Sequence, residues 1–376
     1  MIPFDPAAQA LRVALARRHD DPAVEAARER WAAYDAHAEH LTGRFAGLYA
    51  VRSFAYVQPV HLQRGVPARL RKPYATRVSY TDWGPEDAPL LICGGGVVNS
   101  AMRFAFLAAD LRGSHRVICM DWLGRGRSGW LADEREYTRA TYVEQLKQLV
   151  AHLGEAARRP FTLLGSSMGG TVAIDYAARH PARVGRLVLN DVGPFIPRAR
   201  RRRRAETLAR FYVFPTPDDL TRRVGASQKH DGPVSDDIRR FVAYHQTRWS
   251  DDNAGRVYRH DVRALHAYRD EAKTSLSQWD AWARIRCPVL VLHGMQSDAL
   301  SQRTLDRMRR GHALTVAHIP DTGHTPVLAD RHQTACIADW LRGEGAAAEF
   351  SVPHAAVRGD GDTNDSIASF SENLRS

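Results

Sequence analysis

Two adjacent serines, Ser166 and Ser167, stand between glycines in the segment LLGSSMGG (163–170). An apolar run precedes this segment and a helical pattern follows it, so its G-x-S-x-G spacing is typical of a sharp strand-to-helix turn that exposes a nucleophilic hydroxyl. The spacing selects Ser167, because a turn centred on Ser166 would be flanked by Leu164 and Met168, whose side chains would clash. The predicted chemistry is attack by the Ser167 hydroxyl on an electrophilic carbon.

A serine hydroxyl needs a general base, and that base needs an orienting carboxylate. Chains with this kind of turn carry them in the order serine, acid, histidine. His324 follows the apolar run of VAHIPDTGHTP, and Asp298 follows that of VLVLHGMQSDAL, so we predict His324 as the base and Asp298 as its partner. Asp191 in LVLNDVGP also follows a strand-like run and is the competing acid, although we favour for it a carboxylate that caps backbone amides. Asp321 is interpreted as a turn residue.

An oxyanion that forms on the attacked group needs two hydrogen-bond donors. The backbone N–H of Met168 is the predicted first donor, since it directly follows Ser167 at the start of a helix. The second is expected from GGGVVNS (94–100), where Gly96 and Val97 are both candidates. The same glycines do not predict a dinucleotide site, because the G-x-G-x-x-G spacing is absent.

The elements that position these residues follow from a repeated alternation between residues 76 and 194. Short apolar runs alternate there with helical patterns, which predicts an α/β fold with a mostly parallel sheet flanked by helices on both faces. Catalytic groups gather at the carboxyl ends of such strands, so Ser167, Asp298 and His324 can meet at one edge. The alternation stops over 195–283 and then resumes, which predicts a helical cap inserted into the sheet.

We predict five segments along the chain. A polar N-terminal helical arm packs on the main domain, with a partner-binding helix as the alternative, and the C-terminal tail is Gly-, Asp- and Ser-rich and expected to be disordered. The predicted bounds are 1–55 for the arm, 56–194 and 284–343 for the two parts of the core, 195–283 for the cap and 344–376 for the tail.

Aromatic and arginine residues near the cap are candidates for substrate binding. Trp122, Phe211 and Tyr212 are predicted to line the pocket, although such aromatics more often form the core of a cap. The run RARRRRR (198–204) is interpreted as a solvated helix, with an electropositive rim that attracts carboxylate-bearing or polymeric acidic substrates as the alternative. Nucleic-acid binding is not predicted, because no aromatic platform accompanies the arginines.

The composition excludes several classes of protein. The chain has 376 residues and a formal charge of +11, but much of the excess charge lies in that one arginine run. Its four cysteines lack paired spacing, so neither a disulfide framework nor a zinc site is predicted. No secretory signal or apolar stretch of membrane-spanning length is evident, and we expect a cytoplasmic protein.

The motifs together resemble the α/β-hydrolase fold superfamily, in its branch of lid-bearing bacterial serine hydrolases. The resemblance covers about 76–343 and rests on DWLGRGRSGW, LLGSSMGG, RLVLNDVGPFIP, CPVLVLHGMQSDAL and PDTGHTPVL. It implies an eight-stranded sheet with the cap after the sixth strand, and a triad of Ser167, Asp298 and His324. A His-Gly pair usual in such relatives is replaced within Gly94–Gly96, which leaves the second oxyanion donor open.

The resemblance implies hydrolysis of a carboxylic ester through an acyl-enzyme on Ser167, without a metal or an organic cofactor. The expected substrate is a small-molecule ester, with an anionic one as a further option, and no oligomeric state is implied. A lactonase or a carbon–carbon bond hydrolase with the same triad is the alternative. An acyltransferase and a catalytically inactive binding module are more distant alternatives, because the fold hosts many chemistries.

Overall fold

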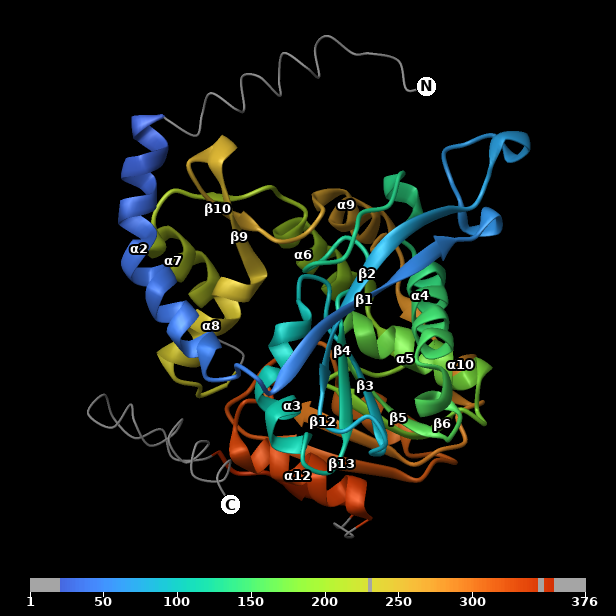
Figure 1. Ribbon diagram of the computed structural model, residues 1–376. Helices are drawn as coiled ribbons and strands as arrows, with labels where there is room; N and C mark the ends of the chain where they lie inside the picture. Colours follow the sequence, from blue (N-terminus) through green and yellow to red (C-terminus); the bar gives the residue numbers. More distant parts are fainter. Residues whose placement is uncertain (1–20, 229–231, 344–347, 355–376) are drawn as a thin grey trace.

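A large, mostly parallel sheet organises the protein in this computed structural model, which describes residues 21–228, 232–343 and 348–354 (Figure 1). The strand order is β1-β2-β4-β3-β5-β6-β12-β13-β14, with β1 and β2 antiparallel to their neighbours and the others parallel. The strands are β1 Tyr49–Gln58, β2 Tyr74–Trp83, β3 Leu90–Gly94, β4 Arg116–Met120, β5 Phe161–Ser166, β6 Val184–Asn190, β12 Val289–Gly294, β13 Leu314–Ile319 and β14 Glu349–Ser351. The predicted α/β class is confirmed.

Two hydrophobic cores cover the two faces of the sheet, because successive side chains of a buried strand point to opposite faces. In β3, Leu90 and Ile92 belong to one core, whereas Leu91 and Cys93 belong to the other. The first core is covered by α4 Arg139–His152, α5 Met168–Arg179, α10 Trp279–Trp282 and α11 Gln302–Met308, and the second by α3 Ala105–Leu111 and α12 Arg331–Arg342. The central strands are therefore sandwiched between helical layers, as Figure 1 shows.

The sheet has nine strands rather than the predicted eight, because part of the predicted disordered tail forms β14. This short strand pairs in parallel with β13, and its flanks add hydrogen bonds from Val316 N to Ala348 O at 2.9 Å and from Val352 N to His318 O at 2.8 Å. The exposed edge of β13 offers unpaired backbone groups, which a following chain segment can satisfy. The rest of the predicted tail, residues 344–347 and 355–376, lies outside the described residues.

Most of the segment between β6 and β12 lies above the parallel strands of the sheet in Figure 1, and this segment corresponds to the predicted cap. It contains helices, as predicted, but also a three-stranded antiparallel sheet of order β8-β10-β9 and a two-stranded pair of β7 with β11. Its elements are β7 Phe195–Ile196, α6 Arg198–Leu208, β8 Val213–Phe214, α7 Pro217–Gln228, α8 Asp236–Gln246, β9 Thr247–Ser250, β10 Gly255–Tyr258, α9 Val262–Glu271 and β11 Leu276–Ser277. The short 3-10 helices are η2 Val60–Leu62, η3 Ala68–Leu70, η4 Ala101–Phe104, η5 Glu134–Glu136, η6 Gly154–Ala157 and η7 Asp251–Asn253.

The N-terminal helix α2 (Pro22–Gly43) packs along most of its length on this cap segment, and its last turn reaches the second core of the main sheet (Figure 1). Asp21 caps it by accepting a hydrogen bond from Ala23 N, and Pro22 occupies the first turn, where its missing N–H costs nothing. Trp31 and Tyr34 then join a small apolar cluster with Phe214, Leu220, Val224 and Ala243 from the cap segment. Leu41 of α2 and Phe45 belong to the second core together with Trp83, and β1, which begins at Tyr49, is a strand of the main sheet, so residues 21–55 contact both the cap segment and the main domain. Residues 1–20 lie outside the described chain.

Replacing Trp31 with alanine is expected to destabilise this contact strongly. The indole is 1% exposed and donates from Nε1 to Pro215 O at 3.1 Å, so truncation removes a large buried ring and leaves a cavity. We expect the free energy of unfolding to fall by about 3–5 kcal/mol, together with faster amide hydrogen exchange in α7 and α8. Arg30→Ala, on the exposed side of the same helix, is the control and should change stability by about 0.5 kcal/mol or less. Equal effects of the two substitutions would contradict this packing.

None of the helices in the described parts of the chain is both long and apolar enough to cross a membrane.

Candidate active site

Ser167 occupies the turn between β5 and α5, in a strained backbone conformation with φ 51° and ψ −114°. The neighbouring glycines are required by close backbone approach. A Cβ at Gly165 would lie 2.4 Å from Gly170 Cα, and one at Gly169 would lie 2.1 Å from Gly94 O. Ser166 is fully buried and its Oγ accepts from an asparagine side chain inside the protein, so the hydroxyl of Ser167 is the one that lines a cavity. Strain at such a turn is typical of functional sites.

A chain of hydrogen bonds runs from this serine to a buried carboxylate. His324 Nε2 lies 2.9 Å from Ser167 Oγ, and His324 Nδ1 lies 2.8 Å from Asp191 Oδ2. The three residues follow the carboxyl ends of β13, β5 and β6, so the parallel sheet brings them together at one edge. Asp191 is fully buried and accepts two further hydrogen bonds, from Gly294 N at 3.1 Å and Ser297 Oγ at 2.5 Å. These donors hold the carboxylate in one orientation.

The structure contradicts the predicted pairing of Asp298 with His324. Asp298 instead accepts from the cap helix α6, with its Oδ1 3.3 Å from Arg200 Nε and its Oδ2 2.7 Å from Arg203 Nη2. Partial burial acts to raise the pKa of Asp298, but the two arginines hold that pKa below its usual value. These two contacts hold the carboxylate of Asp298 at the guanidinium groups, and Asp191 occupies the place beside His324.

The sequence identifies both Asp191 and Asp298 as candidate acids, but it does not determine which of them lies beside His324. The sequence favours for Asp191 a carboxylate that caps backbone amides; in the structure it accepts from Gly294 N, and it also contacts His324. The strand before it, β6, is the direct neighbour of β12, which precedes Asp298. The loops after β6 and β12 leave the sheet at the same edge, so each of them passes near His324. The order of the residues in the sequence therefore does not determine which of the two acids contacts the histidine. Asp321 has φ 48°, in agreement with its interpretation as a turn residue.

The imidazole of His324 is kept neutral by its surroundings. Burial lowers its pKa below the ordinary value of 6.5, and Arg200 and Arg204 lower it further, against the hydrogen bond to Asp191, which acts to raise it. A neutral imidazole whose Nδ1–H is donated to Asp191 presents the unprotonated Nε2 to Ser167. The arrangement is that of a hydroxyl beside a general base.

Two backbone N–H groups beside Ser167 have no hydrogen-bond acceptor among the described residues, those of Met168 and Val97. The N–H of Gly96, the other candidate, donates to Asn99 Oδ1 at 2.9 Å and is therefore occupied. Arg125, which is 1% exposed, donates from Nε to Val97 O at 2.8 Å and so fixes this loop from below. Of the two candidates left open by the sequence, Val97 is thus the one with a donor to offer.

The three aromatic residues predicted to line the pocket do not line the cavities around Ser167. Trp122 is 1% exposed and donates from Nε1 to Gly95 O at 2.8 Å, so it supports the loop before Val97 from within the core. Phe211 is 61% exposed. Tyr212 packs within the cap, where it stacks on Phe214 and contacts the guanidinium of an arginine. These side chains serve packing, the role that aromatics in a cap more often have.

Two adjoining cavities open at Ser167 and share Val97, Arg200 and Tyr268 in their walls. The wider one, of about 340 Å³, contains His324 and is rich in arginine. The narrower one, of about 50 Å³, lies against Met168 and does not include His324. Its walls combine the apolar and aromatic residues Tyr137, Tyr142, Ile196, Ala264 and Leu276 with the charged residues Arg125, Arg139, Arg200, Arg201 and Glu271. The serine thus stands between a polar space and a less polar one.

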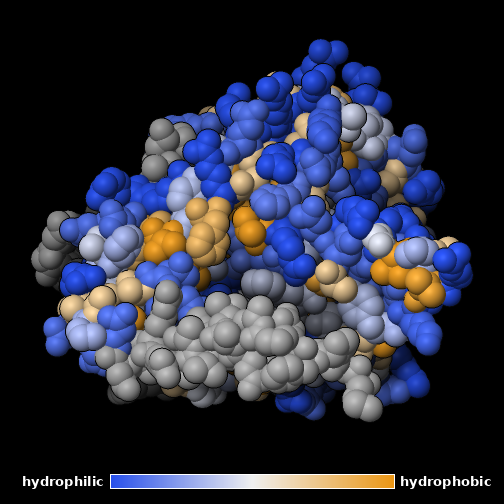
Figure 2. All heavy atoms as spheres, turned by 90° about the horizontal axis from the view of Figure 1, so that it is seen from above, coloured by the Kyte–Doolittle hydropathy of each residue, from blue (hydrophilic) through white to orange (hydrophobic). Residues whose placement is uncertain are grey.

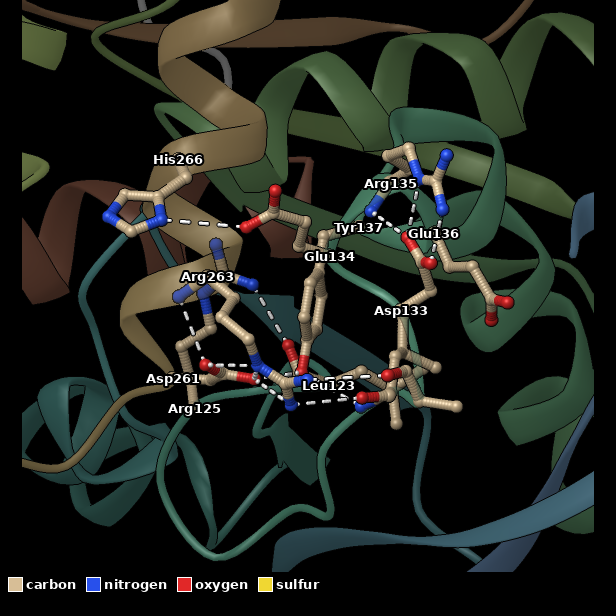
Figure 3. Close-up of polar contacts among 12 residues, drawn as sticks. Leu123, Arg125, Asp133, Glu134, Arg135, Glu136, Tyr137, Asp261, Arg263 and His266 are labelled. Atoms are coloured by element: carbon tan, nitrogen blue, oxygen red, sulfur yellow. Dashed lines mark hydrogen bonds and ion pairs between the residues drawn. The ribbon is translucent and has the colours of Figure 1, made fainter. Parts of the chain in front are cut away.

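The roof of these cavities is attached to the core by a buried polar network, drawn in Figure 3. Tyr137, from the core segment after β4, donates to Asp261 Oδ2 at 2.7 Å, and Asp261 also caps α9 by accepting from Arg263 N at 3.0 Å. Arg263 pairs with the same carboxylate at 2.8 Å, and His266 lies 3.5 Å from Glu134 nearby. Because Tyr137 and Asp261 are almost fully buried, this network fixes α9 over the serine.

Comparison with known proteins identifies the family. A family model for the alpha/beta hydrolase fold matches residues 88–330, more than half of the chain. The chain is similar to a 3-hydroxybutyrate-oligomer hydrolase of Cupriavidus necator, with 29% identity over 289 residues that cover 71% of this chain and 93% of that protein.

Solved structures show the same fold. A putative hydrolase from Rickettsia typhi superposes with a TM-score of 0.71 at 20% identity, covering 79% of this chain and all of that one. An alpha/beta hydrolase from Novosphingobium aromaticivorans superposes with a TM-score of 0.64 at 24% identity, covering 78% and 98%. With the family model, the strand order and the position of the serine turn in agreement, this chain belongs to the alpha/beta hydrolase family.

Proposed function

We propose that this protein hydrolyses carboxylic esters of small molecules through an acyl-enzyme on Ser167, with His324 as the general base and Asp191 as the orienting carboxylate. The observation that carries the proposal is the continuous contact from Ser167 Oγ through His324 to Asp191, at 2.9 and 2.8 Å. Acyl transfer needs such a nucleophile, base and acid, together with donors for the oxyanion. The name of the relative from Cupriavidus necator adds support, because oligomers of a hydroxy acid are joined by ester bonds.

In the proposed mechanism, Ser167 Oγ attacks the ester carbonyl while His324 Nε2 takes its proton. Asp191 keeps the proton on Nδ1 and stabilises the imidazolium that forms. The N–H groups of Met168 and Val97 donate to the oxyanion of the tetrahedral intermediate. His324 then returns the proton to the departing alcohol, and a water molecule releases the acid from Ser167 by the same steps.

A panel of p-nitrophenyl esters of increasing acyl length, combined with labelling by a fluorophosphonate, tests this proposal. We expect turnover of at least one short ester and a covalent adduct on Ser167, located by peptide mass spectrometry. If Ser167 is labelled but no ester is hydrolysed, a lactonase or a carbon–carbon bond hydrolase becomes the better explanation. Product formation that requires an added alcohol or thiol acceptor would instead support an acyltransferase.

The acidic limb of the pH profile is expected below pH 6.5. His324 acts as a base only when neutral, and burial lowers its pKa with additional help from Arg200 and Arg204, so activity should persist to a lower pH than an unperturbed histidine allows. Arg204→Gln removes one of these positive charges and should move the inflection of kcat/KM to a higher pH. Arg202→Gln is the matched control, since Arg202 lies on the same helix but pairs with Glu206 at the surface. A wild-type inflection at or above pH 6.5 would contradict the environment described for His324.

A further inference from the structure

The wider cavity beside Ser167 is lined by more cationic than anionic side chains. Four arginines line it, namely Arg103, Arg200, Arg203 and Arg204, whereas Asp298 is the one carboxylate among the described residues of its wall. His324 adds no compensating negative charge. Figure 2, which views the molecule from above, shows a face on which hydrophilic residues predominate. A concave wall of one sign of charge attracts ligands of the opposite sign.

Arg200 is the buried member of this group. Its side chain is 8% exposed, and the contact from its Nε to Asp298 at 3.3 Å is longer than that from Arg203 at 2.7 Å. Two guanidinium groups thus share one carboxylate that is itself 53% exposed. Burial of a guanidinium group costs free energy unless a negative charge lies beside it. Because the single charge of Asp298 compensates only one of the two guanidinium groups, the pair can bind a second anion.

The narrower cavity is lined by arginines as well, but apart from Arg200 these have other partners; Arg139, for example, pairs with Asp175 at 2.7 Å. Arg201 of α6 lines the narrower cavity, where it donates to Thr274 O at 2.8 Å and lies 3.7 Å from Glu271. Arg202 is on the solvent side and pairs with Glu206 at 2.8 Å. Each of these two arginines has an acid to itself, whereas Arg200 and Arg203 do not.

The position of His324 indicates which part of an ester enters the arginine cavity. The histidine must return its proton to the departing alcohol oxygen, so the alcohol part has to lie on the side of His324. His324 and Arg203 line the wider cavity and not the narrow one next to Met168, whereas Arg200 lines both. The narrow cavity, of about 50 Å³, is left for a short acyl group.

We propose that Arg200 and Arg203 form a subsite for a carboxylate carried on the alcohol part of the ester, so that the preferred substrates are short acyl esters of hydroxy acids with a free carboxylate. This inference rests on the proposed ester hydrolysis and adds the charge and the orientation of the substrate. Asp298 holds the two guanidinium groups in position in the free protein, and the planar guanidinium of Arg200 offers the paired donors that suit a carboxylate. Asp298, which the sequence predicts as the acid of the triad, therefore has a positioning role for the two arginines in this proposal.

The test compares two substrates that differ only in this charge, the butyryl ester of 3-hydroxybutyrate with a free carboxylate and the methyl ester of the same compound. We expect wild-type kcat/KM to favour the free acid by about tenfold or more, mainly through KM. Arg200→Gln and Arg203→Gln should each reduce this ratio toward one, whereas Arg202→Gln should preserve it. Added salt should reduce the wild-type ratio as well.

The outcomes separate this inference from the proposed function. If the wild type cleaves the acid and the methyl ester equally well, or if neither arginine variant changes the ratio, the carboxylate subsite is wrong while ester hydrolysis stands. If neither compound nor any p-nitrophenyl ester is cleaved, the proposed function itself fails. A third substrate, p-nitrophenyl succinate, carries its carboxylate on the acyl part, and a preference for it over p-nitrophenyl butyrate would overturn the assigned orientation. Because Arg203 is 67% exposed, its replacement remains informative even if Arg200→Gln does not fold.

Discussion

Replacing Ser167 with alanine is expected to lower kcat for ester hydrolysis by at least about 10⁴-fold. The substitution removes the one atom to which the acyl group is proposed to be transferred, and water in its place would lack the fixed position 2.9 Å from His324 Nε2. Any residual rate would come from the N–H groups that stabilise the oxyanion. The measurement is single-turnover and steady-state hydrolysis of the best p-nitrophenyl ester.

Ser166→Ala is the matched control for this substitution. It changes the adjacent residue by the same atom, but the Ser166 hydroxyl is buried beside Asn190 and does not face the cavity. We expect this variant to retain activity within about tenfold of the wild type and to remain reactive toward a fluorophosphonate. Loss of labelling in Ser166→Ala with retention in Ser167→Ala would show that the wrong hydroxyl has been assigned.

Replacing Asp191 with asparagine is expected to lower kcat by about 10³–10⁴-fold with little change in fold. The amide fills the same space but can donate to His324 Nδ1, which favours the tautomer that carries its proton on Nε2. That proton faces Ser167 Oγ and prevents the histidine from acting as a base. The buried imidazolium of the transition state would also lose its compensating charge, since Asp191 is fully buried.

Asp298→Asn provides the comparison that decides between the two acids. Asp298 contacts Arg200 and Arg203 but not His324, so its loss should alter substrate selectivity and cost far less in kcat than the loss of Asp191. Asp321→Asn is a neutral control, because Asp321 is exposed, lies three residues before His324 and has a positive φ that asparagine also tolerates. If Asp298→Asn abolished hydrolysis while Asp191→Asn did not, the proposed triad would be wrong.

Features governed by neighbours in the sequence were predictable. The alternation of apolar runs and helical patterns predicted the α/β class, because each buried strand and amphipathic helix carries its own periodicity. The glycines around Ser167 predicted its sharp turn, since Gly165 and Gly169 are required by contacts within a few residues or with the adjacent strand. The tail was predicted less well, because the pairing of β14 with β13 depends on an open sheet edge and not on the composition of the tail.

Helix α2 also shows that the sequence pattern does not determine contacts between distant segments. Its periodicity of Trp31, Tyr34 and Ala38 correctly identified a buried helical face, but nothing in that pattern specified which part of the face contacts the cap and which part the main core. The apolar cluster with Phe214 and Leu220 exists only because β8 and α7 of the cap reach the helix in three dimensions. Hydrophobic burial is not directional, so a stripe predicts that something covers it and not what does.

By itself the sequence determined the fold class, the serine turn and the loop that carries His324, because each depends on local sterics and periodicity. Only the tertiary structure decided that Asp191 rather than Asp298 contacts the histidine, and that Arg200 and Arg203 face the cavity beside it. The physical reason is that a hydrogen bond acts only over a short distance. Which carboxylate lies 2.8 Å from the imidazole of His324 depends on the paths of the loops that follow adjacent strands, and on the charged side chains of the cap that lie above these loops. Those quantities are set by packing between segments far apart in the chain.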